Sequence, residues 1–379
     1  MKFLNKLKNN FSILINIINF NNERKKFLFY SENISYRKYA YYIIEVLAKK
    51  YPGQIGYVSS DIKDRIDNLN IKNLYIGNGF LMNLFFSIIK IDYLFLTLTD
   101  LGNHLIKKTK NVGKYIYYFH AAISTFKSYT NTAFDNYDII LCNSKFQLEE
   151  IRKREKDKKL PKKQLIESGY FYFDYLSDKI SKKNQARDIL IAPSWNYDHR
   201  NFINENFIKI VDYLINKKMN VIFRPHPEHF KRSKEILEKI KEKFNNFENF
   251  YFDENDENFL SMEKSKCLLT DASGISIEFL ILFKRPVLYL FDKDKIHNKD
   301  ISDFRGLKSI DEIIRDKFGY TFYEKDINDL DSIIEKTNVN FQSKIQYLDT
   351  FIKNNFFNFG NTKKKFDLII ENQIIKKNK

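Results

Sequence analysis

The chain is poor in the residues that build disulfide frameworks and metal sites. Only two of its 379 residues are cysteines. Cys142 and Cys267 lie in apolar, strand-like runs, which suits a reducing compartment and excludes a disulfide framework. No zinc-site spacing and no nucleic-acid-binding motif is present. Asp292 and Asp294 have the spacing of a metal-binding pair, which we interpret as a solvated loop. We therefore expect no metal-binding side chains, no cofactor and no nucleic-acid partner.

Long apolar segments are also missing. Asparagines interrupt the apolar residues of positions 1–20, and no small-residue cleavage site follows. This segment is therefore a poor signal peptide and too polar to span a bilayer. Its periodicity predicts an amphipathic helix, which either lies on a membrane or, as is commoner, packs on its own domain. We expect a cytoplasmic protein and leave open a peripheral association with the inner face of the cytoplasmic membrane.

The composition is basic and aromatic. The 64 Lys and Arg residues outnumber the 48 Asp and Glu residues, which gives a formal net charge of +16. This excess favours an anionic partner, such as a nucleotide-activated donor, a polyanionic polymer or an anionic membrane surface. A hydrophobic content of 43% with 16% aromatic residues argues against disorder. The length of the chain predicts two domains.

Strand-like and helix-like segments alternate along the chain. This alternation predicts an α/β protein with two doubly wound, Rossmann-like domains and a cleft between them. A polar stretch at residues 181–187 is the best boundary. We place an N-terminal, acceptor-side domain at residues 1–185 and a C-terminal domain that binds a nucleotide donor at residues 186–345. Residues 346–379 are expected to form helices that pack back on the N-terminal domain, and residues 61–69 a helix within it.

The segment at residues 267–290 is the first candidate site. It reads as a buried strand, a turn of small residues, a helix and a further strand. The free N–H groups and the positive end of the helix dipole make such a turn an anion site. Glu278 follows about one helical turn in, where its carboxylate can accept hydrogen bonds from ribose hydroxyls. The alternative is an ordinary connection between strand and helix. The candidate donor-binding and phosphate-binding residues of the segment are Asp271, Ser273, Gly274, Ser276 and Glu278.

A second candidate site follows the apolar strand at residues 220–223. This strand ends at Arg224, and His226 stands between two prolines that hold the loop extended. An arginine fork and an imidazole together suit a phosphate or pyrophosphate. A histidine is more often structural, but core packing gives little reason for one at this strand end.

Two other strand ends add groups to the same cleft. The strand at residues 115–119 leads to His120, and the strand at residues 189–192 leads to Ser194 and Trp195. Parallel strands of two domains that face each other bring such ends around one cavity. The second domain would then hold an activated, anionic donor, while His120 of the first domain would serve as a base for an acceptor.

At these residues the chain resembles the CDP-glycerol glycerophosphotransferase family, the teichoic-acid primases and polymerases. The similar segments are FH at 119–120, DIILCNSKF at 138–146, ILIAPSW at 189–195, FRPHP at 223–227 and TDASGISIEF at 270–279. The resemblance covers about residues 110–375 and implies a GT-B fold. It also implies that His120 is the catalytic base, that Arg224 and His226 act at the pyrophosphate, and that Ser273 and Gly274 meet the donor phosphate.

Two positions depart from the pattern of that family. The Gly-Thr pair after the first histidine is replaced by Ala121 and Ala122, and a Tyr-Ser-Ser block is replaced by residues 272–274. The second variant resembles the turn of UDP-N-acetylglucosamine 2-epimerases, in which a glutamate of the following helix binds ribose. Glu278 fits that role. These departures bear on the choice of donor more than on the choice of fold.

The expected function is the transfer of glycerol phosphate, or a related polyol phosphate, from a CDP-activated donor to a hydroxyl of a cell-surface glycan or lipid-linked acceptor, with release of CMP. One alternative is a GT-B glycosyltransferase that uses a sugar nucleotide in capsule or lipopolysaccharide biosynthesis. Another is a basic scaffold that binds polyanionic glycan at a membrane. The joint presence of the arginine, histidine, serine and glutamate residues described above argues against that scaffold.

Overall fold

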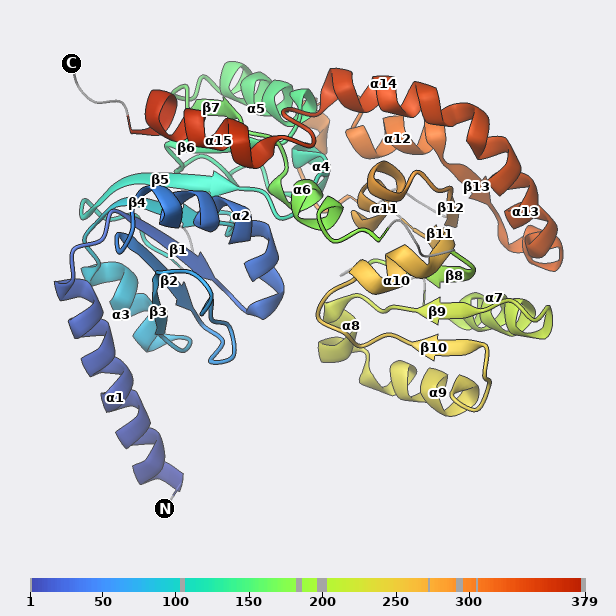
Figure 1. Ribbon diagram of the computed structural model, residues 1–379, viewed down its shortest axis with the longest axis horizontal. Coiled ribbons are helices and arrows are strands. Elements are labelled where there is room, and N and C mark those ends of the chain that lie inside the picture. Colours follow the sequence, from blue (N-terminus) through green and yellow to red (C-terminus); the bar gives the residue numbers. More distant parts are fainter. Residues whose placement is uncertain are drawn as a thin grey trace.

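The structure is a computed structural model of the chain and describes residues 2–102, 106–181, 186–195, 203–271, 273–290, 296–304 and 306–375. These residues form two parallel sheets, one of seven strands and one of six, with helices packed on them (Figure 1). The prediction of an α/β protein with two doubly wound sheets is confirmed.

The first sheet lies in the N-terminal half of the chain. Its strands are β1 (Phe27–Ser31), β2 (Ile55–Ser59), β3 (Lys72–Tyr75), β4 (Ile91–Leu96), β5 (Val112–Tyr118), β6 (Ile139–Cys142) and β7 (Gln164–Glu167). They pair in the order β3-β2-β1-β4-β5-β6-β7, and every pair is parallel. The strand order therefore reverses between β1 and β4, as in a dinucleotide-binding fold.

The second sheet repeats this arrangement. Its strands are β8 (Asp188–Ile191), β9 (Val221–Phe223), β10 (Phe250–Phe252), β11 (Ser265–Thr270), β12 (Val287–Leu290) and β13 (Tyr320–Phe322). They pair in parallel in the order β10-β9-β8-β11-β12-β13. The order reverses between β8 and β11, which is where ligands bind in such sheets, beyond the carboxyl ends of the strands.

Helices connect the strands and cover the sheets. In the first half they are α1 (Lys2–Asn22), α2 (Ile34–Lys50), α3 (Phe80–Ile88), α4 (Thr125–Ser128), α5 (Lys145–Asp157) and α6 (Phe171–Ser177). In the second half they are α7 (Glu205–Asn216), α8 (Pro227–Arg232), α9 (Lys234–Phe244), α10 (Phe259–Lys264), α11 (Ile275–Phe283), α12 (Ile310–Phe318), α13 (Leu330–Phe341), α14 (Ile345–Asn355) and α15 (Thr362–Ile369). Shorter helical turns are η1 (Ile301–Phe304), η2 (Glu324–Asp329), η3 (Gln342–Lys344) and η4 (Ile370–Ile374).

Helix α1 extends away from the N-terminal domain (Figure 1). Ile13 and Ile17 are buried in the core of that domain, while Phe11 and Ile15 on another side of the helix are exposed. The helix therefore packs on its own domain along one face only. No helix within the described part of the chain is long and apolar enough to cross a membrane.

The predicted helix at residues 61–69 is wrong, because this segment is an irregular loop. The side chain of Asn73 pairs with both backbone groups of Ile66, with each donor and acceptor 2.9 Å apart. Asp61 accepts a hydrogen bond from the backbone N–H of Lys63. These side chains occupy the backbone groups that a helix would have paired.

Helix α6 joins the two domains. Its Tyr172 and Phe173 share an apolar core with Phe279 of α11 and Ile352 of α14. In the same helix, Asp174 accepts hydrogen bonds from the backbone N–H groups of Gly360 and of Thr362, the first residue of α15, and α15 contacts α2 and α6. Helix α14 therefore contacts elements of both domains, while α15 contacts helices of the N-terminal domain. The proposed boundary at residues 181–187 lies partly outside the described residues.

Candidate functional site

A cavity of about 520 Å³ lies between the two domains and is lined by residues of both. Figure 1 shows the arrowheads of β5 and β9 pointing toward the space between the domains. Most of the lining comes from the segments that follow β1 and β5 in one sheet and β8, β9, β10 and β11 in the other, and His297 and helix α12 add to it. The cavity therefore meets the second sheet at the reversal of its strand order, where a nucleotide is expected.

The start of α11 forms one wall of the cavity. Ser273, Gly274 and Ile275 all line it. Among the described residues, none accepts a hydrogen bond from the backbone N–H of Gly274 or Ile275. These two donors and the positive end of the helix dipole suit a phosphate group.

Two residues of the same segment are placed differently from our expectation. Ser276 is buried and does not line the cavity, because its hydroxyl donates to the carbonyl oxygen of Ser273 at 2.6 Å. Asp271 accepts hydrogen bonds from the backbone N–H of Ser194 at 2.7 Å and from its hydroxyl at 2.6 Å. Asp271 therefore ties the end of β11 to the end of β8. We now assign both residues to holding the turn in place.

Arg224 reaches the cavity from the end of β9. Its Nη1 donates to Asp253 at 2.7 Å and its Nη2 to the carbonyl oxygen of Asn255 at 2.8 Å. Burial alone would raise the pKa of Asp253, but the Arg224 guanidinium and a hydrogen bond from Ser261 hold it below its usual value. The guanidinium is thus oriented by an ionised carboxylate.

His226 lines the cavity from the start of α8. Its Nδ1 accepts a hydrogen bond from the backbone N–H of Glu228 at 3.2 Å, so the proton of the neutral ring is on Nε2. A ring held in this way can donate Nε2–H to an anion. Two other predicted residues, Ser194 and Trp195, also line the cavity and are buried. The Trp195 ring packs edge to face on the His229 ring, with 4.8 Å between the ring centroids.

Glu278 lines the cavity as a buried carboxylate. It accepts hydrogen bonds from the hydroxyl of Tyr170 at 3.1 Å and the amide of Asn258 at 3.4 Å. Burial raises the pKa of Glu278 to about 7, although the nearby Lys38 ammonium lowers it. The carboxylate that we expected to meet ribose is thus also paired with the N-terminal domain through Tyr170.

His120 lines the opposite wall, directly after β5. Within the described part of the chain, its Nδ1 is buried and has no hydrogen-bond partner. Burial lowers the pKa of His120 to about 4, so the ring is neutral at neutral pH. A neutral imidazole can accept a proton, and no carboxylate of the described residues is hydrogen-bonded to Nδ1 of this ring.

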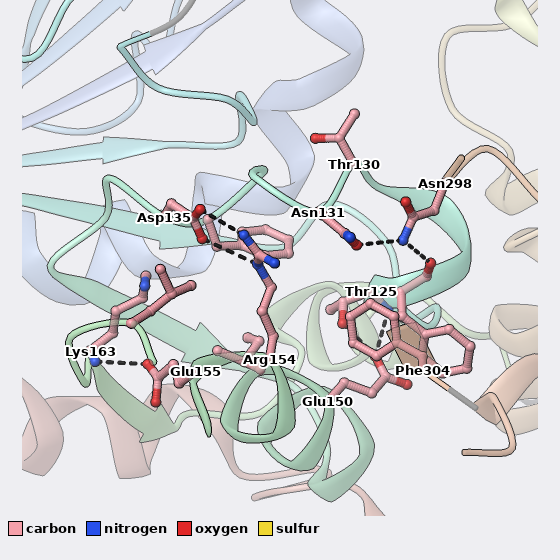
Figure 2. A pocket seen from close by; sticks show the side chains of 14 residues that line it. Thr125, Thr130, Asn131, Asp135, Glu150, Arg154, Glu155, Lys163, Asn298 and Phe304 are labelled. Atoms are coloured by element: carbon pink, nitrogen blue, oxygen red, sulfur yellow. Dashed lines mark hydrogen bonds and ion pairs between the residues drawn. The ribbon is translucent and has the colours of Figure 1, made fainter. Parts of the chain in front are cut away.

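Carboxylates of two helices accept hydrogen bonds from the loop that follows His120. Glu150 of α5 accepts from the hydroxyl of Ser124 at 3.0 Å and from the backbone N–H of Thr125 at 2.6 Å, and Figure 2 shows its carboxylate directed at Thr125. Asp311 of the second domain accepts from the backbone N–H of Ser124 at 3.0 Å. Both carboxylates therefore position the loop that carries His120.

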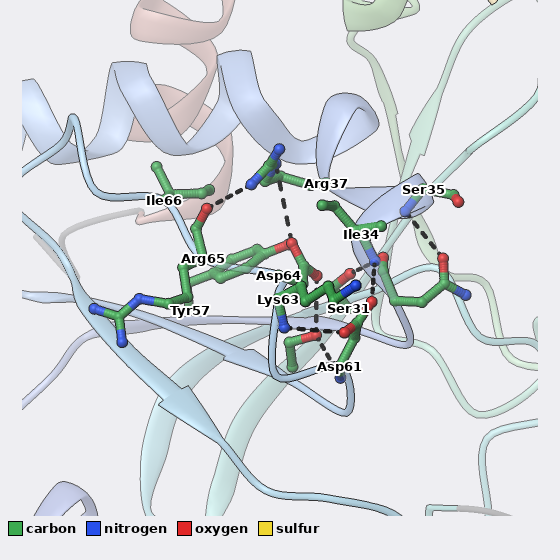
Figure 3. Close-up of polar contacts among 12 residues, drawn as sticks. Ser31, Ile34, Ser35, Arg37, Tyr57, Asp61, Lys63, Asp64, Arg65 and Ile66 are labelled. Atoms are coloured by element: carbon green, nitrogen blue, oxygen red, sulfur yellow. Dashed lines mark hydrogen bonds and ion pairs between the residues drawn. The ribbon is translucent and has the colours of Figure 1, made fainter. Parts of the chain in front are cut away.

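Helix α2 brings further side chains to the cavity, and its start is fixed by polar contacts (Figure 3). Asn33 caps the helix by accepting from the backbone N–H of Ser35 at 2.9 Å. The buried carboxylate of Asp64 accepts from the hydroxyl of Tyr57 at 2.9 Å and lies 4.0 Å from Nε of Arg37 in the first turn. The first turn of α2 is therefore held against the sheet.

Several lining residues were missed by our sequence analysis. Tyr36, Lys38 and Tyr39 begin the helix after β1, and Tyr129 follows α4. Asp253 does not line the cavity but holds the guanidinium of Arg224, and it was missed as well. Asp253 directly follows β10, and the segment that begins at Tyr36 lies shortly after β1. These positions after strand ends could have identified the residues from the sequence.

No group of three or more potential ligand side chains is placed to hold a metal ion within the described residues. Asp292 and Asp294, the pair with metal-like spacing, lie outside the described residues.

Comparisons with known proteins identify similar structures. Neither a protein-family model nor a curated protein sequence matches the chain. The wall teichoic acid polymerase TagF is 16% identical over 96% of this chain and 97% of that chain, with a TM-score of 0.60, and a TagF variant has been solved with CDPG. MnaA of S. aureus with UDP is 10% identical over 93% and 97%, with a TM-score of 0.59. A UDP-GlcNAc 2-epimerase of Methanocaldococcus jannaschii is 14% identical over 92% and 99%, with a TM-score of 0.57.

These matches cover nearly the whole chain and include both domains. They show that the chain has the GT-B fold, which confirms the fold expected from the sequence. At this level of identity they show the fold alone.

The burial of His120 predicts an unusual titration. Its C–H proton signals, assigned by their loss in His120→Gln, should not shift between about pH 8 and about pH 6 and should titrate near pH 4. The unfolded chain takes up this proton near the usual pKa of 6.5, so the free energy of unfolding falls as the pH drops from 6.5 toward 4. A midpoint at or above the usual value would contradict the burial of this ring.

Proposed function

We propose that the protein transfers a polyol phosphate, such as glycerol phosphate, from a CDP-activated polyol to a hydroxyl of a cell-surface glycan or lipid-linked acceptor and releases CMP. The observation that carries this proposal is the convergence of groups on one cavity. The start of α11, Arg224 and His226 line it from the second domain, and His120 lines it from the first. The structural likeness to TagF, one structure of which contains CDPG, supports the same reading.

In this reaction the acceptor hydroxyl loses its proton to His120, and its oxygen attacks the β-phosphorus of the donor. The bond between that phosphorus and the bridging oxygen breaks, and CMP leaves with the bridging oxygen. Arg224, His226 and the N–H groups of Gly274 and Ile275 stabilise the charge on the phosphates. Positioning and charge stabilisation of this kind are the main contributions of a protein to phosphoryl transfer.

The donor would also strengthen the base. Burial disfavours the imidazolium form of His120 in the free protein. An anionic donor bound in the same cavity favours that form and therefore raises the pKa of His120. Proton transfer to His120 is then easiest when the donor is present, which limits side reactions in its absence.

We infer a second candidate, the transfer of a sugar from a sugar nucleotide. The observation that favours it is Glu278, which lines the cavity one turn into α11. The similar structures of MnaA with UDP and of the UDP-GlcNAc 2-epimerases are consistent with a uridine nucleotide. In this reaction the acceptor attacks a sugar carbon, and a nucleoside diphosphate leaves.

A thermal-shift panel tests the choice of donor. CDP-glycerol or CDP-ribitol should raise the melting temperature of the protein by mass action, and Arg224→Ala should remove most of this shift. Arg65→Ala is the matched control, because Arg65 is exposed, pairs with Asp67 and does not line the cavity. Stabilisation by UDP-sugars or CMP-sugars alone would replace the proposal with the second candidate.

Turnover of His226 variants tests the phosphate-binding wall. His226→Asn keeps a side-chain oxygen that can cap α8 but lacks Nε2–H. We expect turnover of CDP-glycerol to fall about 100-fold, as on loss of one donor to a transition-state oxygen, while the melting temperature stays close to that of the parent. His226→Ala should lose at least as much. Full activity in either variant would refute the role given to this ring.

A further inference from the structure

Three tyrosines surround His120 on the wall of the cavity formed by the N-terminal domain. Tyr36 packs edge to face on the imidazole at 5.3 Å between ring centroids, Tyr39 lies at 6.0 Å and Tyr129 at 6.4 Å. All four rings line the cavity and are half-buried. We call Tyr36, Tyr39 and Tyr129, together with His120, the tyrosine box.

The box differs from the aromatic core around it. Tyr117 and Tyr172 nearby are fully buried, whereas the tyrosines of the box retain surface toward the cavity. Tyr36 and Tyr39 are three residues apart on α2 and so share one face of that helix. Because the first turn of α2 is held by its cap and by Asp64, these rings are positioned before any ligand binds.

The charge on this wall is low for a protein with a net charge of +16. Among the described residues, the lysines that line the cavity from the N-terminal domain are Lys38 and Lys127, whereas Lys231, Arg224 and Arg315 line it from the second domain. Lys127 is paired with Glu312 at 3.0 Å. Lys38 lies over the rings of Tyr39 and Tyr172, 5.3 Å and 5.2 Å from their centroids. Such a wall offers aromatic faces rather than the row of cations that a polyanionic chain requires.

The two walls approach each other where donor and acceptor would meet. A Cβ atom placed on Gly274 would lie 3.3 Å from Cγ2 of Ile123 and 3.9 Å from Cβ of Ala121. Gly274 starts α11, and Ala121 directly follows His120. A ligand in the tyrosine box therefore lies beside the helix start that would hold the donor phosphates.

We propose that the tyrosine box is the acceptor subsite and that it takes a sugar ring, so that the hydroxyl presented to His120 is carried by a glycan and not by a linear polyol phosphate chain. Aromatic faces pack on the apolar C–H face of a sugar, while phenol hydroxyls and the imidazole meet its polar edge. This inference rests on the proposed function for the identity of the donor. The binding of the sugar to the box can be measured without any donor.

Saturation-transfer NMR with two probes, methyl β-D-glucopyranoside and methyl N-acetyl-β-D-glucosaminide, tests this subsite. We expect transfer from protein aromatic protons to the sugar C–H protons of at least one probe. Tyr36→Ala and Tyr129→Ala should each weaken binding about tenfold, while Tyr36→Phe, which keeps the ring, should bind within about twofold of the parent. Tyr347→Ala is the control, since Tyr347 is an exposed tyrosine that does not line the cavity.

The outcomes separate this inference from the proposed function. If neither sugar binds, or if Tyr36→Ala and Tyr129→Ala bind as the parent does, the sugar subsite is wrong. The same holds if glycerol 3-phosphate gives the transfer signals and the sugars do not. If the sugars bind the box but no CDP-polyol raises the melting temperature, the donor assignment fails and the subsite stands. Retention of the melting temperature in each variant shows that it is folded.

Discussion

Two parallel sheets can present groups to one ligand only when their carboxyl ends face each other. Ion pairs between the domains support that arrangement: Lys127 pairs with Glu312 at 3.0 Å, and Lys158 pairs with Asp303 at 2.8 Å. The close approach of Gly274 to the loop after β5 places the start of α11 beside this loop. Groups of both domains therefore share a single cavity, although they come from distant parts of the chain.

Burial determines the charges in this cavity. It lowers the pKa of His120 to about 4 and that of Lys38 to about 8, and it raises that of Glu278 to about 7. At neutral pH the His120 ring is therefore neutral, while most of Lys38 is cationic. The cavity thus combines a neutral proton acceptor with cations and helix N–H groups that suit phosphate. This distribution fits the transfer of a group from an anionic donor better than passive binding of a polymer.

The sequence was sufficient to predict the fold and to locate candidate residues at the ends of strands. Arg224 and His226 could be placed because an apolar run marks a strand, and parallel strands end at one edge of a sheet. The donor-binding roles of Ser276 and Glu278 were predicted from their positions in the helix alone. Their partners depend on tertiary contacts, such as that between Glu278 and Tyr170 of the other domain, which no local pattern contains. Helix α6, which begins directly after Tyr170 and packs between the domains, was missed for the same reason.

The identity of the released nucleotide tests the central claim most directly. The protein would be incubated with a glycan acceptor and either CDP-glycerol or a UDP-sugar, and the products would be followed by phosphorus NMR. Attack at the β-phosphorus predicts CMP from CDP-glycerol, and His120→Gln should abolish its release. Release of a nucleoside diphosphate from any donor, with CDP-glycerol left intact, would mean attack at a sugar carbon and would contradict the account.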